Sequence, residues 1–164
     1  MQFMNRESIE IVEVKSAEDF VAGKALIEEY AATLGIDLCF QNFSEEIASL
    51  AEIYGPPNGC LLLARQSNEM AGCVAVRKQA AAVCEMKRLY VRRPYRGAGL
   101  GRRLADMAIG RARQLGYSQV VLDTLPSMAE AQALYESLGF REVAGYYQNP
   151  MNGIRYLALE LTAE

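Results

Sequence analysis

The segment from Arg96 to Arg103, Arg-Gly-Ala-Gly-Leu-Gly-Arg-Arg, constrains the fold of this chain most. It follows an apolar run that ends at Val91 and leads into an amphipathic run that begins near Leu100. The pattern predicts a strand, a tight glycine turn and the start of a helix. A helix N-terminus exposes unpaired N–H groups and carries roughly half a positive charge, so it binds phosphate groups well. A bare Gly-x-Gly is also typical of an exposed loop, but arginines in a first helical turn oppose the helix dipole and therefore favour a bound anion.

Length and composition predict one domain that spans residues 1–164. Hydrophobic residues make up 51% of the chain and charged residues 23%, as in a soluble globular protein. No apolar run approaches the roughly 20 residues that a bilayer requires, so no membrane association is expected. The first residues, Met1–Arg6, lack the apolar stretch of a secretory signal, which predicts a cytoplasmic location.

Net charge and cysteine content bear on nucleic-acid binding, on metal binding and on the state of the thiols. The net charge is −3 and the basic residues form no long stripe, so nucleic acid is not an expected partner. The chain has no histidine, and its cysteines are widely spaced, which argues against a metal site. We expect four reduced and mostly buried thiols, at Cys39, Cys60, Cys73 and Cys84.

Hydrophobic periodicity predicts an α+β (mixed α/β) domain. A helix that joins the strand ending at Val91 to the next strand predicts one parallel βαβ crossover in a mixed, largely antiparallel sheet. Ser16, Ser44 and Ser127 are expected to cap helices. Seven strands are expected at 9–14, 60–65, 70–77, 83–91, 120–123, 140–143 and 154–161, with about four helices at 16–33, 44–53, 99–115 and 127–139.

Two common phosphate-binding folds do not match the glycine turn. A nucleotide-binding P-loop needs a lysine after its last glycine, and no lysine follows Lys87. A dinucleotide-binding fold needs a third glycine where this chain has Arg102, and its turn follows the first strand rather than the fourth.

The chain resembles the GNAT superfamily of acyl-CoA-dependent N-acyltransferases. The family's phosphate-binding motif, Gln/Arg-x-x-Gly-x-Gly/Ala, matches Arg96–Gly101. Residues 89–95, Leu-Tyr-Val-Arg-Arg-Pro-Tyr, are similar to the strand end before that turn, and Ala133–Phe140 is similar to the second cofactor motif. With the order of elements, the resemblance covers nearly the whole chain.

The resemblance implies that acetyl-CoA is the cosubstrate, with no metal. Backbone groups of Leu89 and Val91 would pair with pantetheine, and one of their N–H groups would stabilise the thioester oxygen. The family often has an asparagine where this chain has Met128, so that side-chain contact is not expected here. The expected cofactor residues are Leu89, Tyr90, Val91, Arg96, Gly97, Ala98, Gly99, Leu100, Gly101 and Arg102.

The implied reaction is direct attack of a primary amine on acetyl-CoA in a ternary complex, which needs a proton acceptor and a proton donor. Glu85 is the candidate acceptor because it lies in an otherwise apolar strand, where several family members carry a basic glutamate. It could equally form an ion pair with Lys87, two residues on. Tyr135 matches the family's tyrosine near the sulfur, although it could also be an ordinary packed aromatic.

Phe40, Tyr146 and Tyr147 are expected to line the acceptor site, although surface or dimer contacts would explain them equally well. The acceptor is expected to be a small molecule or an amino acid. The alternatives are a protein or peptide N-terminal acetyltransferase and a non-catalytic acyl-CoA-binding module. The segment from Tyr146 to Gly153 should close the acceptor groove for a small molecule and leave it open for a peptide. A homodimer is compatible with the resemblance.

Overall fold

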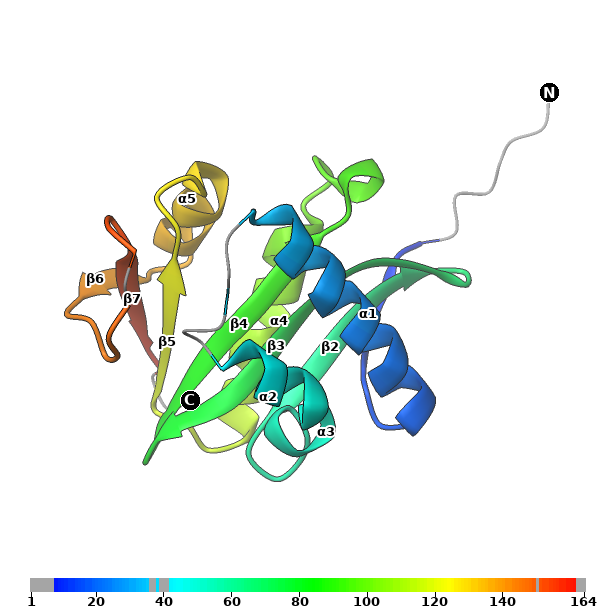
Figure 1. Cartoon of the computed structure of the whole chain (residues 1–164), viewed down its shortest axis with the longest axis horizontal. Coiled ribbons are helices and arrows are strands. Elements are labelled where there is room, and N and C mark those ends of the chain that lie inside the picture. The colour runs from blue at the N-terminus through cyan, green and yellow to red at the C-terminus, as the bar shows by residue number, and fades with distance from the viewer. Residues whose placement is uncertain (1–7, 36–37, 39–41, 150, 162–164) are drawn as a thin grey trace.

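The structure is a computed structural model that describes residues 8–35, 38, 42–149 and 151–161. Within these residues the chain forms one seven-stranded sheet, five α-helices and a short 3-10 helix (Figure 1). The strands are β1 (Glu10–Glu13), β2 (Cys60–Gln66), β3 (Glu69–Ala80), β4 (Val83–Val91), β5 (Gln119–Thr124), β6 (Arg141–Val143) and β7 (Arg155–Glu160). The helices are α1 (Ala17–Thr33), α2 (Phe43–Ala48), α3 (Leu50–Ile53), η2 (Arg93–Tyr95), α4 (Leu100–Gln114) and α5 (Ala129–Ser137).

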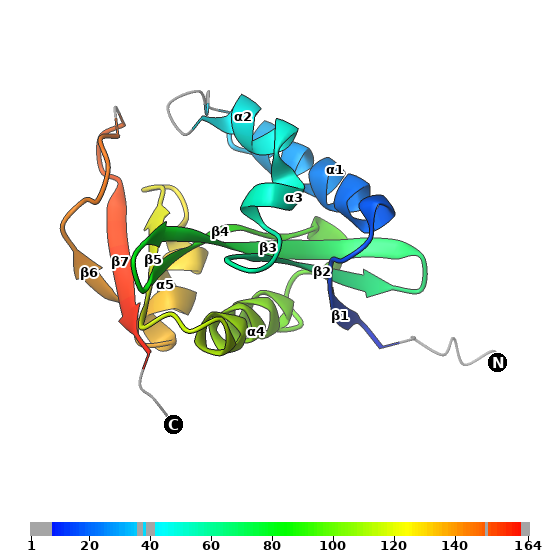
Figure 2. The same cartoon turned by 90° about the horizontal axis from the view of Figure 1, so that it is seen from below.

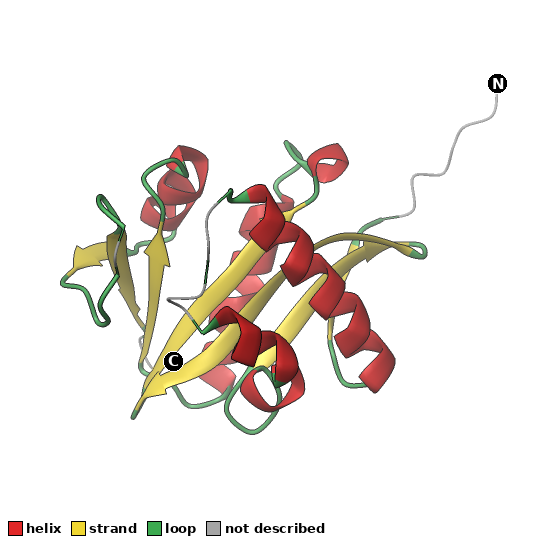
Figure 3. Cartoon of the chain, viewed as in Figure 1, coloured by secondary structure: helices red, strands yellow, loops and turns green. Residues whose placement is uncertain are grey.

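The strand order is β1-β2-β3-β4-β5-β7-β6, and only the β4–β5 pair is parallel. Helices α1, α2 and α3 cover one face of the sheet, and α4 and α5 cover the other (Figures 2 and 3). The expected mixed sheet with a single parallel crossover through a helix is therefore confirmed. None of the helices in the described part of the chain is long and apolar enough to cross a membrane.

Each face of the sheet has its own hydrophobic core. One core packs α4 residues such as Leu104 against β4 and β5. The other packs Leu26 and Ile27 of α1 against β2 and β3. Strand β4 contributes to both cores, with Met86 on the α4 face and Tyr90 on the α1 face. Regular alternation would place residues four apart on the same face, and the pairing with β3 is irregular between these two positions.

The starts of three helices can be compared with the N-caps expected from the sequence. Ser16 caps α1 as expected, since its side chain accepts a hydrogen bond from the Asp19 N–H at 3.1 Å. The predictions for Ser44 and Ser127 are wrong: α2 begins after Asn42 and α5 after Met128, neither with a side-chain cap. The predicted second helix is also divided in two at Ser49, so the described chain has five α-helices rather than four.

The parallel pairing between β4 and β5 is short, and this positions the site. It covers Val83–Glu85 on β4 and Gln119–Val121 on β5. Both strands continue, β4 to Val91 and β5 to Thr124, but they diverge, and no described residue of β5 pairs with β4 beyond Glu85. The backbone of β4 from Met86 onward therefore faces an opening, called the β4–β5 cleft below.

Candidate active site

Three hollows run along the β4–β5 cleft, and Leu89 and Ala131 line all of them. The outer hollow lies at the glycine turn and at α5. The middle hollow extends along Leu89–Val91 to the N-terminus of α5, and the inner hollow reaches Lys87, Asp123 and Tyr135. Because they share these residues, the hollows adjoin one another from the glycine turn to the point where the strands divide, and together they are called the channel below.

The glycine turn leaves the start of α4 open to a ligand. Gly97 has a φ of 87° and Gly99 a φ of 79°, and a Cβ built at either would meet nothing within 4 Å. Gly99 is the N-cap of α4, a 15-residue helix without an acidic residue in its first turn. This end therefore presents free N–H groups and the positive end of the helix dipole to the outer hollow.

Most of the expected cofactor residues line this channel. Leu89, Val91, Arg96, Gly97, Gly99, Leu100, Gly101 and Arg102 line the outer hollow, and Tyr90 lines the middle one. The Arg102 guanidinium donates to the Ser137 hydroxyl of α5 at 2.9 Å, which holds α4 and α5 on either side of the outer hollow. Ala98 lines none of the three hollows.

A bulge in β4 shapes the inner hollow. Cys73 of β3 pairs with Tyr90 and Ala75 pairs with Lys87, so β4 has one residue more than its partner between these pairs. Arg88 adopts a φ of 61° there, a left-handed conformation that costs a non-glycine residue about 1–3 kcal/mol. As a result the consecutive residues Lys87, Arg88 and Leu89 all line the inner hollow.

Glu85 is buried with an exposed fraction of 1% and is held by three neighbours. Its Oε1 accepts from the Arg77 Nε at 2.8 Å and lies 3.9 Å from the Lys87 Nζ, so the alternative ion pair is present. Its Oε2 accepts from the Tyr146 hydroxyl. Glu85 lines none of the three hollows, and its role as a proton acceptor stays a prediction.

Asp123 is a second carboxylate of the site and was not among the residues expected from the sequence. It is half-buried near the end of β5 and lines the inner hollow together with Tyr135. Its Oδ2 accepts from the Tyr147 hydroxyl, which in turn accepts from the Asn149 Nδ2 at 3.0 Å. The available signal was an acidic residue at the end of the apolar run Val120–Leu122, next to a parallel strand.

Tyr135 lies across the inner hollow from the β4 residues. It is 8% exposed and packs edge-on against Phe140, with ring centroids 5.7 Å apart. Burial raises the pKa of Tyr135 above its ordinary value, and the charge of Asp123 adds to this. The hydroxyl is therefore protonated at neutral pH and able to donate a proton.

Tyr146 and Tyr147 lie in the segment between β6 and β7, which reaches back across the sheet. Their rings pack edge-on with centroids 5.4 Å apart, and both contact the Tyr156 ring. Through their hydroxyls they bridge a carboxylate of β4 and one of β5. Phe40, the third expected acceptor residue, lies outside the described residues, as does Cys39.

The other three cysteines are buried and free, as expected. Burial raises the pKa of each of the Cys60, Cys73 and Cys84 thiols to about 12, so their thiolate forms are rare at neutral pH. None of the three lines the β4–β5 cleft.

A mixed sheet whose central parallel strands diverge beside a glycine turn defines an acyltransferase fold, and comparisons with known proteins agree. The model of the acetyltransferase (GNAT) family matches residues 24–140. An uncharacterized N-acetyltransferase of Schizosaccharomyces pombe is 43% identical over 161 residues, covering 97% of this chain and 99% of that protein. The chain belongs to the GNAT acetyltransferase family, and it is an acyltransferase enzyme.

Two further proteins are similar to this chain, one in sequence and one in fold. The N-acetylaspartate synthetase of Xenopus tropicalis is 32% identical over 105 residues, covering 63% of this chain and 39% of that protein. An acetyltransferase of Bacillus subtilis, solved in complex with CoA, has a TM-score of 0.66 at 20% identity and covers 94% of this chain and 100% of its own.

The residues of the β4–β5 cleft fit acetyl-CoA. The turn at Gly97 and Gly99 has open space where a pyrophosphate would lie, and the N-terminus of α4 faces it. The backbone of β4 from Met86 to Val91, unpaired with β5, suits the amide groups of pantetheine. When bound, acetyl-CoA supplies an acyl group activated as a thioester.

Proposed function

We propose that this enzyme transfers the acetyl group of acetyl-CoA to the primary amine of a small molecule or an amino acid. Both substrates are held in the β4–β5 cleft, and the amine attacks the thioester directly. The N–C bond forms as the C–S bond breaks, one proton leaves the amine and one is delivered to the departing sulfur.

The hydrogen bonds of Tyr146 and Tyr147 are the observation that supports the choice of a small acceptor. They tie the segment between β6 and β7 to Glu85 and to Asp123, which lines the inner hollow, so this segment lies beside the place where an extended peptide would need an open groove. The N-acetylaspartate synthetase relative, by its name, forms an N-acetylated amino acid, which supports an acceptor of this size.

The inner hollow is lined by a residue that can accept the amine proton and by one that can donate a proton to sulfur. Alkyl amines have a pKa of about 10 and attack only when neutral, so a base must take their proton. Asp123 lines the inner hollow and is the proton acceptor that we propose beside the predicted Glu85, which reaches the hollow only through its neighbours. Tyr135 donates the proton to sulfur, and the N–H of Leu89 or Val91 stabilises the carbonyl oxygen.

Direct attack also agrees with the positions of the buried thiols. An acyl-enzyme would need an activated nucleophile in the cleft, and the raised pKa values of Cys60, Cys73 and Cys84 keep these thiols protonated. No acetylated protein intermediate is therefore expected on these three cysteines.

The test is thiol release from acetyl-CoA across a panel of free amino acids, small amines and short peptides. For the residue that reacts best, the free amino acid and a peptide beginning with it form a matched pair. We expect kcat/KM at least about tenfold higher for the free compound. A preference for the peptide would support the N-terminal acetyltransferase instead, and acetyl-CoA binding without turnover on any amine would indicate a non-catalytic module.

A further inference from the structure

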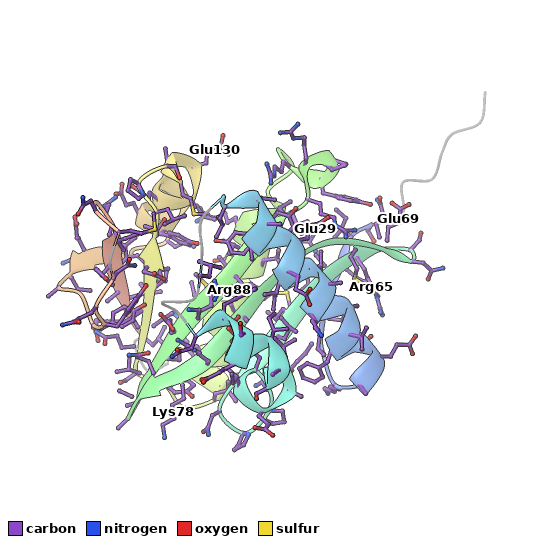
Figure 4. The ribbon with its side chains drawn as sticks, viewed as in Figure 1. Glu29, Arg65, Glu69, Lys78, Arg88 and Glu130 are labelled. Atoms are coloured by element: carbon purple, nitrogen blue, oxygen red, sulfur yellow. The ribbon has the colours of Figure 1, made fainter. Side chains whose placement is uncertain are left out.

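At the bulge of β4, Arg88 forms an ion pair with Glu46 of α2, one of the helices that cover the α1 face of the sheet. Glu46 of α2 receives two hydrogen bonds from Arg88, one from Nε at 2.9 Å and one from Nη2 at 2.8 Å. Glu46 is 1% exposed and Arg88 6%. Figure 4 shows Arg88 near the centre of the face that α1 and α2 cover.

Arg88 is fixed at two other points as well. Its guanidinium lies 5.3 Å from the centre of the Phe43 ring, also on α2. Its carbonyl oxygen accepts a hydrogen bond from the Cys73 thiol of β3 at 3.3 Å. Side chain and backbone are therefore both anchored at a residue whose left-handed conformation needs support from its surroundings.

The pKa of Glu46 agrees with a close ion pair between Glu46 and Arg88. Burial acts to raise the pKa of Glu46, but the hydrogen bonds and charge of Arg88 lower it below its ordinary value. The carboxylate is therefore charged at neutral pH, and a neutral side chain at this position would leave the Arg88 guanidinium buried without its counter-ion.

We propose that Glu46 is a positioning residue for the acyl donor: by holding Arg88, it keeps the β4 bulge in the conformation that lines the acetyl-CoA channel. The inference rests on the acetyl-CoA site proposed above. The ion pair links α2, which lines none of the three hollows, to the strand proposed to contact the donor.

The test is calorimetric titration of acetyl-CoA into Glu46→Gln and into a matched control, Glu13→Gln. Glu13 forms a similar double hydrogen bond with Arg111 at 3.2 and 3.0 Å, and neither residue lines the cleft. We expect Glu46→Gln to raise the Kd for acetyl-CoA at least about tenfold, and Glu13→Gln to change it by less than about twofold.

A rescue experiment separates positioning from general stabilisation. Glycine adopts a positive φ without strain, whereas alanine does not. If Glu46 acts by holding this conformation, adding Arg88→Gly to Glu46→Gln restores acetyl-CoA affinity, and adding Arg88→Ala does not. Both double variants lack the buried charge, so they remain informative if Glu46→Gln alone fails to fold.

Each other outcome overturns the inference. Wild-type affinity in Glu46→Gln, or equal affinities in the two double variants, would show that the ion pair only stabilises the fold. A wild-type protein that does not bind acetyl-CoA would remove the proposed function and the inference together.

Discussion

Asp123 and Glu85 are two carboxylates on neighbouring strands that each accept a tyrosine hydroxyl, yet their surroundings differ. Glu85 lies within a cationic pair, Arg77 and Lys87, and outside the three hollows. Asp123 lines the inner hollow opposite Lys87. The first arrangement favours a structural role and the second favours contact with substrate.

Matched substitutions at the two carboxylates test this assignment. Asp123→Asn should lower kcat by roughly 10²–10⁴-fold with acetyl-CoA affinity nearly unchanged, because the proton acceptor is lost and the donor site is not. Glu85→Gln should lower the free energy of unfolding by about 3 kcal/mol, because Arg77 and Lys87 lose a buried counter-charge, while kcat falls by less than about tenfold.

Steady-state kinetics and urea unfolding of both variants provide the comparison. The reverse pattern, with activity lost in Glu85→Gln and retained in Asp123→Asn, would assign proton transfer to Glu85.

Among the helices, α4 begins at the proposed phosphate site, and Gly116 after its end lines none of the three hollows. Gly99 before it and Gly116 after it both have positive φ and open space around them. The same substitution at both sites therefore imposes similar backbone strain, and only Gly99 faces the proposed pyrophosphate.

Gly99→Asp should raise the Kd for acetyl-CoA by at least about tenfold, because a carboxylate would repel the phosphates. Gly116→Asp should leave the Kd within about twofold of wild type while lowering the melting temperature to a similar extent. Calorimetry and thermal unfolding measure the two effects. Equal affinities in the two variants would mean that the glycine turn does not hold the phosphates.

The elements also show what sequence could and could not predict. The bounds of β4 and the ends of α4 follow from hydrophobic periodicity and flanking glycines, and the structure places them as expected or within one residue. The caps expected at Ser44 and Ser127 failed because α2 and α5 begin after Asn42 and Met128, and no side-chain hydrogen bond caps either helix.

The part of the candidate site that lies on one continuous segment, the glycine turn, was expected from the sequence. The parts that combine residues far apart in the sequence were not expected. Arg88, at the bulge, is hydrogen-bonded to Glu46, which is 42 residues away, so no local pattern marks this contact. Asp123 joins Tyr135 only because β4 and β5 diverge after Glu85, which is a property of the sheet and not of either strand.

For the whole molecule, the cleft depends on both helical layers and on the part of the sheet around β4 and β5. Helices α1 and α5 line its sides, and the tyrosines between β6 and β7 approach its base. In the proposed reaction, donor and acceptor share this one opening, as direct transfer requires.

Hydrogen–deuterium exchange of the intact protein, with and without saturating acetyl-CoA, tests the location of the donor most directly. We expect slower exchange of amides in residues 86–91 and 97–103, because a ligand there would protect the open strand and the start of α4. Exchange in β1 and β2 should stay the same. No protection at saturation, or protection confined to segments outside the β4–β5 cleft, would show that acetyl-CoA does not bind in this cleft.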